Sequence, residues 1–111
     1  MGPMVALTDA IAAVLRSVRW GDVVTYAEVA DEAGYPGRAR AVGHFLAATD
    51  GEFPWWRVVA ANGRLAPGHE HEQATRLRAE GVAVGERGVI GMRTRRRRPT
   101  GVRRVPRGSS S

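Results

Sequence analysis

The sequence predicts a mainly α-helical domain of the winged helix-turn-helix class, with a small β-hairpin, over residues 1–91, and a disordered arginine-rich tail over residues 92–111. Three observations lead to this prediction. Two stretches with helical apolar spacing are joined by the short turn Tyr35-Pro36-Gly37, which is the helix-turn-helix pattern. Asn62-Gly63, a strong hairpin signal, follows them and predicts a wing. The last twenty residues are mostly Arg, Pro, Gly and Ser, so they have little to bury.

The positive charge of the chain is concentrated in the tail. Seventeen basic residues, all of them arginine, face eleven acidic ones, and the formal net charge is +6. Residues 93–111 carry eight of these arginines and no acid, whereas residues 1–92 carry nine arginines and all eleven acids. An arginine-rich tail is typical of polyanion binding, because each phosphate that it neutralises releases a counterion. The alternative is a solvated end that binds acidic surfaces without specificity.

Length and residue usage narrow the remaining classes. At 111 residues the chain is long enough for one domain with its own hydrophobic core. The absence of cysteine excludes disulfides, thiolate zinc sites and a cysteine nucleophile. No signal peptide or membrane-spanning run is recognised, so we expect a cytoplasmic, nucleoid-associated protein. His69 and His71 lie two residues apart and do not share a helix face, so we expect neither a metal nor a cofactor.

The first helix is expected over about residues 7–18, and Thr8 or Asp9 can cap its start. Gly21-Asp22 breaks the helix, and Val23-Val24 is a short extended piece. The apolar residues that recur at helical spacing in this helix are Leu7, Ile11, Val14, Leu15 and Val18.

The second helix is expected to begin at a capping box. In Thr25-Tyr26-Ala27-Glu28 the Thr25 hydroxyl can accept the Glu28 N–H while the Glu28 carboxylate accepts the Thr25 N–H. Gly34 ends this helix, and a third helix begins near Arg38. Its core-facing residues are Val42, Phe45 and Leu46. Many αα-hairpins share this pattern, so it does not by itself identify a DNA-binding domain.

The second half of the domain is expected to contain the wing and one more helix. A strand over Arg57–Ala61 is expected to turn at Asn62-Gly63 and return over Arg64–Ala66. The last helix is expected over Glu72–Glu80, and residues 82–90 form an extended segment.

The most unusual stretch is Pro54-Trp55-Trp56-Arg57-Val58-Val59. Two adjacent tryptophans cannot point the same way in a strand, and each is costly to leave exposed. Either one ring belongs to the core and the other lies half-exposed, or one ring holds a ligand. The residues alone leave both interpretations open.

Three motifs, in this order, resemble the DNA-binding domain of the O6-alkylguanine-DNA alkyltransferases. They are residues 21–30 (GDVVTYAEVA), 38–43 (RARAVG) and 54–59 (PWWRVV). Those enzymes carry Pro-Cys-His-Arg-Val in the third motif, and their cysteine takes the alkyl group from guanine. Here Trp55 stands at the cysteine position, as in the alkyltransferase-like proteins, and Trp56 stands where even those proteins usually keep histidine. An indole cannot attack an alkyl carbon, so the resemblance implies DNA binding without enzymatic repair.

The resemblance also implies residue roles. Arg40 matches the arginine that fills the gap left by an extruded base, with a plain phosphate contact as the alternative. Tyr26 matches the tyrosine beside the phosphate of the flipped nucleotide, with a core tyrosine as the alternative. The expected DNA-binding residues are Tyr26, Arg38, Ala39, Arg40, Ala41 and Gly43, whose small members admit the helix to the minor groove. The expected lesion pocket consists of Tyr26, Trp55, Trp56, Arg57, Val58 and Val59.

Within this pocket the backbone carbonyls of Val58 and Val59 are expected to read the guanine edge. Arg57 follows the pocket directly, so we expect a structural or phosphate-binding role. Glu80 aligns with a glutamate that stands behind the cysteine-activating histidine of the enzymes. Because cysteine and histidine are both absent here, we expect Glu80 to be only a helix-end residue.

The function that the sequence favours is non-enzymatic recognition of O6-alkylguanine in double-stranded DNA, by minor-groove docking and nucleotide flipping. Flipping costs a few kcal/mol, and less for a base whose pairing is already weak. The family implies that the bound lesion is marked for nucleotide excision repair, whose proteins are expected partners. We expect a monomer with no membrane partner. One alternative is a winged-helix regulator that reads sequence without base flipping, and another is an enzyme with a replacement nucleophile, for which no candidate residue is found.

Overall fold

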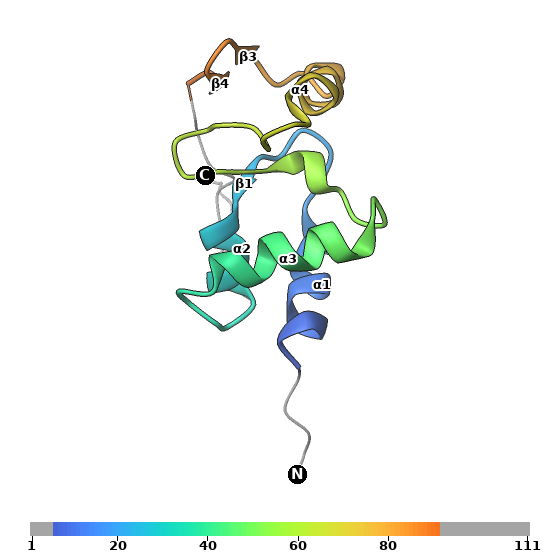
Figure 1. The fold of residues 1–111 in the computed structure, drawn as a ribbon, viewed down its shortest axis with the longest axis vertical. Helices are drawn as coiled ribbons and strands as arrows, with labels where there is room; N and C mark the ends of the chain where they lie inside the picture. The colour runs from blue at the N-terminus through green and yellow to red at the C-terminus, as the bar shows by residue number, and fades with distance from the viewer. Residues whose placement is uncertain (1–5, 92–111) are drawn as a thin grey trace, which may run out of the picture.

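The structure, a computed structural model, describes residues 6–91 as a group of three helices and a second part built on one helix, joined by short strands (Figure 1). The predicted tail over residues 92–111 lies outside the described residues. Among residues 6–91, none of the helices has the length and apolar character of a membrane span. The elements are α1 (Leu7–Ser17), β1 (Val24–Thr25), α2 (Tyr26–Glu32), α3 (Ala39–Thr49), the 3₁₀ turn η1 (Trp55–Arg57), β2 (Val58–Val59), α4 (Glu70–Ala79), β3 (Val84–Gly85) and β4 (Gly88–Val89).

The helices α1, α2 and α3 pack around the larger of two hydrophobic cores, and we call this part the three-helix half. Its buried side chains follow the helical spacing of the sequence, so the predicted helices are confirmed. The predicted cap of α1 was wrong, because the helix begins at Leu7 and the capping position is Ala6, which offers no side-chain acceptor. The core residues are Ile11, Ala12, Leu15, Val18, Val24, Val29, Ala30, Val42, Phe53 and Val58.

The predicted capping box starts α2 at the end of β1. The Glu28 N–H donates to the Thr25 hydroxyl at 3.0 Å, and the Thr25 N–H donates to the Glu28 carboxylate at 2.8 Å. Gly34, with φ of 91°, ends the helix, and the Tyr35 N–H donates back to the Ala30 carbonyl at 2.9 Å. The chain therefore turns tightly into α3, and the helix-turn-helix pattern is confirmed.

The position of the predicted hairpin was wrong. Residues 60–64 do form a tight turn, in which the Gly63 N–H donates to the Ala60 carbonyl at 2.8 Å. However, β2 pairs in parallel with β1, with Val24 opposite Val58, and no strand returns over residues 64–66. Val58 and Val59 are both fully buried, so the strand has no solvent face and lies between the two cores instead of at an edge. The residues before it form the η1 turn and no strand.

The small hairpin is found further along the chain, at β3 and β4, where the sequence predicted only an extended segment. Together with α4 it forms the α4 half, which lies at the opposite end of the molecule from α1–α3 (Figure 1). The helix α4 starts two residues before its predicted start. A side chain at Gly88 would place its Cβ only 2.2 Å from the Gly63 carbonyl oxygen, so only glycine lets β4 reach the 60–64 turn. The core of the α4 half consists of Val23, Val59, Ala74, Leu77 and Val84.

Candidate functional site

A cavity of about 490 Å³ lies between α3, η1 and α4, a size typical of small-molecule sites. Tyr26, the first residue of α2, lines it together with one face of α3. On the other side, Trp55 comes from η1 and charged residues come from α4. The lining residues are Tyr26, Gly43, Leu46, Ala47, Asp50, Gly51, Trp55, Ala66, His69, Glu72 and Arg76.

The two adjacent tryptophans lie in the 3₁₀ turn, and their rings have different surroundings. Both rings are partly exposed, and they meet edge to face, with centroids 6.3 Å apart and planes at 90°. Trp55 lines the cavity and lies 5.8 Å from the ring of His69, whereas Trp56 is not among the lining residues. Trp56 packs against the core of the α4 half, whereas Trp55 packs against neither core. The ring of Trp55 is therefore accessible from the cavity.

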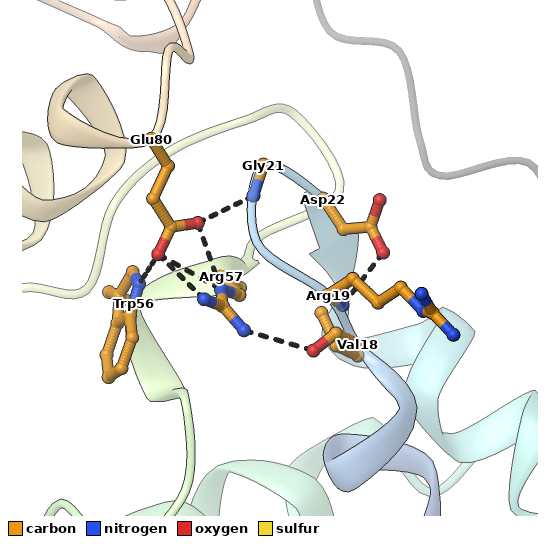
Figure 2. A network of polar contacts seen from close by, with 7 residues as sticks. All are labelled: Val18, Arg19, Gly21, Asp22, Trp56, Arg57 and Glu80. Atoms are coloured by element: carbon orange, nitrogen blue, oxygen red, sulfur yellow. Dashed lines mark hydrogen bonds and ion pairs between the residues drawn. The ribbon is translucent and has the colours of Figure 1, made fainter.

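Trp56 takes part in a group of polar contacts around the Glu80 carboxylate, which we call the Glu80 network (Figure 2). The carboxylate of Glu80, which is only 8% exposed, accepts the indole N–H of Trp56 at 2.8 Å and the backbone N–H of Gly21 at 2.8 Å. Arg57 donates to the same carboxylate through Nε and Nη2 and forms an ion pair at 2.8 Å. Its Nη1 donates to the Val18 carbonyl at 3.0 Å.

The expectation that Glu80 is only a helix-end residue was therefore wrong. Glu80 follows the last residue of α4, but its carboxylate also joins the turn at Gly21, before β1, to η1. Arg57 has the structural role that was one of its two predicted roles, since its side chain is bonded inside the protein. Only an alignment of Glu80 with a family glutamate hinted at this arrangement, because the partners lie 23 to 59 residues away along the chain.

The environment of Glu80 decides its charge. Burial disfavours the ionised carboxylate, but the hydrogen bonds from Arg57, Gly21 and Trp56 and the charge of Arg57 outweigh this, so the pKa of Glu80 lies below its ordinary value. Glu80 is thus ionised at neutral pH and acts only as an acceptor. In the cavity, burial raises the pKa of the Tyr26 phenol, which therefore stays protonated and able to donate.

A second buried polar residue, Gln73, fixes α4 against η1 and β2. Its side chain is fully buried, accepts the Ala66 N–H at 2.7 Å, and donates to the carbonyls of Trp56 at 3.1 Å and Val58 at 3.0 Å. The carbonyl of Val58, expected to read guanine, is thus bonded within the protein. Gln73 was not among the predicted residues; a polar residue beside Ala74 on the inward face of α4 was the available signal.

The structure brings some of the predicted residues together and separates others. Tyr26 and Trp55 line the cavity, as does Gly43 from the predicted DNA-binding surface. Arg38 and Arg40 are exposed at the start of α3, and Ala39 and Ala41 are partly exposed beside them. Four predicted pocket residues do not line the cavity, namely Trp56, Arg57, Val58 and Val59.

The contribution of α4 to the cavity was not predicted. Glu72 and Arg76 line it from this helix, and His69 lines it from the position just before the helix. Within residues 6–91, no group of three or more His, Cys, Asp or Glu side chains is placed to hold a metal ion.

Comparison with known proteins identifies the family. The model of the 6-O-methylguanine DNA methyltransferase DNA-binding domain matches residues 6–82. The chain belongs to this family. A relative named DNA base-flipping protein, from Vibrio parahaemolyticus serotype O3:K6 (strain AQ3810), is 40% identical over 87 residues, which cover 75% of this chain and 87% of the relative.

Two crystal structures of S. pombe proteins have the same fold as the present chain. S. pombe Atl1 in complex with damaged DNA containing O6-carboxymethylguanine is 28% identical, with a TM-score of 0.66 over 75% of this chain and 82% of Atl1. S. pombe ATL in complex with DNA is 26% identical, with a TM-score of 0.63 over 78% of this chain and 88% of the other. The resemblance of the sequence to alkyltransferase-like proteins is thereby confirmed.

Proposed function

We propose that this protein binds O6-alkylguanine in double-stranded DNA, receives the flipped nucleotide in the cavity, and does not transfer the alkyl group. The observation that carries this proposal is Trp55 on the cavity wall, at the position that the resemblance assigns to the cysteine of the enzymes. Stacking of a base on an aromatic ring contributes roughly 1–3 kcal/mol, so an indole can hold the extruded base. The chain contains no cysteine that could accept an alkyl group.

The helix α3 is the proposed recognition helix. Arg40 is exposed near its start and would enter the base stack, while Arg38 would contact phosphate. Tyr26 lies at the border between this surface and the cavity, and its protonated hydroxyl is suited to the phosphate beside the flipped nucleotide. Ala39, Ala41 and Gly43 leave room for the close approach of the minor groove.

Gly43 gives separate support for this surface. It lies inside α3, where glycine is less favourable than alanine by about 1 kcal/mol. A Cβ added at Gly43 would meet no atom within 4 Å, so packing within the described protein does not require glycine there. Because Gly43 also lines the cavity, the missing side chain supports the proposed approach of a ligand from outside.

The main test compares binding to matched duplexes with and without one O6-methylguanine. We expect tighter binding to the lesion and an Arg40→Ala variant that loses most of this preference. A preference below about threefold, ~0.65 kcal/mol, would favour the alternative of a regulator that does not flip bases. An equal loss of affinity on both duplexes in Arg40→Ala would assign Arg40 to a phosphate contact.

Gly43→Ala separates binding from folding. We expect this variant to be as stable as the wild type or slightly more stable, and to bind lesion-containing DNA more weakly. Thermal unfolding and fluorescence anisotropy measure the two properties on the same sample. Undiminished binding by a stable Gly43→Ala variant would contradict the proposed approach of DNA to α3.

The absence of alkyl transfer is tested with a duplex that carries a radiolabelled methyl group on O6 of guanine. We expect no label on the protein, and none on a Trp55→Cys variant, because Trp56 stands where the enzymes keep the histidine that activates their cysteine. Labelled protein from either sample would show that the site supports transfer after all.

On the family resemblance we also propose that the protein acts as a monomer and marks the lesion for nucleotide excision repair. The expected result is faster incision of an O6-alkylguanine duplex by a nucleotide excision repair extract when the protein is added. An Arg40→Ala variant serves as the control with impaired lesion binding.

A further inference from the structure

The side of the cavity formed by α4 is charged, although the substituent of a simple O6-alkylguanine is apolar and offers no partner to a charged group. Glu72 and Arg76 project from adjacent turns of α4, and both line the cavity. They form an ion pair at 3.1 Å, and their side chains are 53% and 45% exposed. Exposed pairs of this i,i+4 kind are weak, so a ligand can compete with Glu72 for the guanidinium.

Arg76 keeps donors available for such a ligand. Both of its contacts with Glu72, from Nε and Nη2, go to the same oxygen, Oε2. A guanidinium has five N–H donors, and the contacts with Glu72 use only those on Nε and Nη2. A carboxylate or another acceptor that enters the cavity can therefore bind Arg76 without displacing Glu72 completely.

Trp56 sets the position of this guanidinium. The Arg76 Cζ lies 4.6 Å from the centroid of the Trp56 ring, and tryptophan is the best aromatic partner for a stacked cation. The ring is itself held by the hydrogen bond from its N–H to Glu80. The resemblance places histidine at this position in related proteins, so the broad ring beneath Arg76 is a feature of this chain.

We propose that Arg76, stacked on Trp56, determines which O6 adducts bind best, and that it favours substituents ending in a hydrogen-bond acceptor, above all a carboxylate, over neutral alkyl chains of similar length. This inference rests on the proposed function, because the adduct reaches Arg76 only if the guanine is flipped into the cavity. Glu72 acts in the opposite direction, since its carboxylate competes for Arg76 and repels an anionic substituent. Asp50, the other acid that lines the cavity, adds to this repulsion.

The test measures dissociation constants for three duplexes that differ only at one guanine, which is unmodified, O6-propylated or O6-carboxymethylated. The readout is the ratio of affinities for the carboxymethyl and propyl duplexes, because contacts with phosphate cancel in it. Arg76→Gln is expected to lower this ratio about fivefold or more, and Glu72→Gln is expected to raise it. Arg64→Gln, which changes an exposed arginine outside the cavity lining, is the matched control and should leave the ratio unchanged.

Two substitutions of Trp56 separate its contact with Arg76 from its contact with Glu80. Trp56→Phe keeps an aromatic face under Arg76 and removes the donor to Glu80. The ratio of carboxymethyl to propyl affinity is therefore expected to stay close to the wild-type value. Trp56→His keeps a donor and loses most of the face, so the ratio is expected to fall. Thermal unfolding of both variants checks that they remain folded.

The possible outcomes are distinct. A ratio that does not change in Arg76→Gln, or that moves in the same direction in Arg76→Gln and Glu72→Gln, overturns the role of Arg76 and leaves the proposed function standing. Wild-type protein that binds all three duplexes equally overturns the proposed function itself, and the role of Arg76 with it.

Discussion

The two halves of the molecule are held together by different forces. In the three-helix half, apolar side chains such as Ile11, Leu15 and Val42 are fully buried, and the core includes no charged group. In the α4 half the apolar core is smaller, and the fully buried Gln73 and the nearly buried Glu80 connect α4 to η1. Apolar packing has no preferred direction, whereas a hydrogen bond fixes both distance and orientation.

This difference matters for the cavity, because its walls come from both halves. The three-helix half supplies α3, and the α4 half supplies the charged wall against which Trp55 lies. The directed contacts of Gln73 and Glu80 determine where η1 sits relative to α4. We therefore expect replacement of the buried polar residues that join α4 to η1 to change both the stability of the protein and the shape of the cavity.

The largest effect is expected from Arg57→Met. It leaves the Glu80 carboxylate buried without its charged partner, which typically costs 3–5 kcal/mol, so we expect a loss of about 4 kcal/mol in the free energy of unfolding. Urea denaturation measures this loss, and Arg64→Met, at an exposed site, should stay within about 0.5 kcal/mol of the wild type. A double variant with Glu80→Met should recover much of the loss, because no buried charge remains. A loss below about 1 kcal/mol in Arg57→Met would show that the ion pair does not hold the halves together.

Gln73→Leu tests the second directed contact. Leucine has a similar size and no polar group, so the Ala66 N–H and the carbonyls of Trp56 and Val58 lose their shared partner. We expect a loss of about 3 kcal/mol in the free energy of unfolding, measured by urea denaturation. If Gln73→Leu were instead more stable than the wild type, the α4 half would be held by apolar packing in the same way as the three-helix half.

Glu80→Gln is expected to lower the free energy of unfolding by about 2 kcal/mol at neutral pH. The amide still accepts a hydrogen bond but carries no charge. This cost should depend on pH. The pKa of Glu80 is lower in the folded protein than in the unfolded chain, so its ionised form stabilises the fold above the ordinary glutamate pKa. That contribution is lost as the pH falls through the lowered folded-state value. The free energies of unfolding of the wild type and Glu80→Gln, plotted against pH, should therefore converge in acid. Parallel curves would show that the ionisation of Glu80 does not contribute to stability.

Thr25→Ala, in the three-helix half, is expected to have the smallest effect. It removes the acceptor for the Glu28 N–H from the capping box at the start of α2 and should lower the free energy of unfolding by about 1 kcal/mol. The distances between η1 and α4 should not change, so lesion binding, once established for the wild type, should be retained. A loss of binding comparable to that of the α4-half variants would show that the two halves are not separable in this way.

The helices were predictable because their signals are local. The apolar spacing of residues 7–18 and the box Thr25–Glu28 act within one or two turns, so neighbouring residues are enough to specify them. The same is true of the tight turn at Asn62-Gly63, which exists although the strand before it pairs elsewhere. The motif around Trp55 also indicated where a ligand site would be found.

Only the tertiary structure decided which distant segments meet. The parallel pairing of β2 with β1, the position of the hairpin at residues 84–89, and the joining of Gly21, Trp56 and Arg57 by Glu80 all link residues far apart in the chain. The charged wall of the cavity likewise follows from the packing of α4 against η1. Such contacts depend on the balance of burial, hydrogen bonding and chain geometry over the whole domain, and no short stretch of sequence carries that balance.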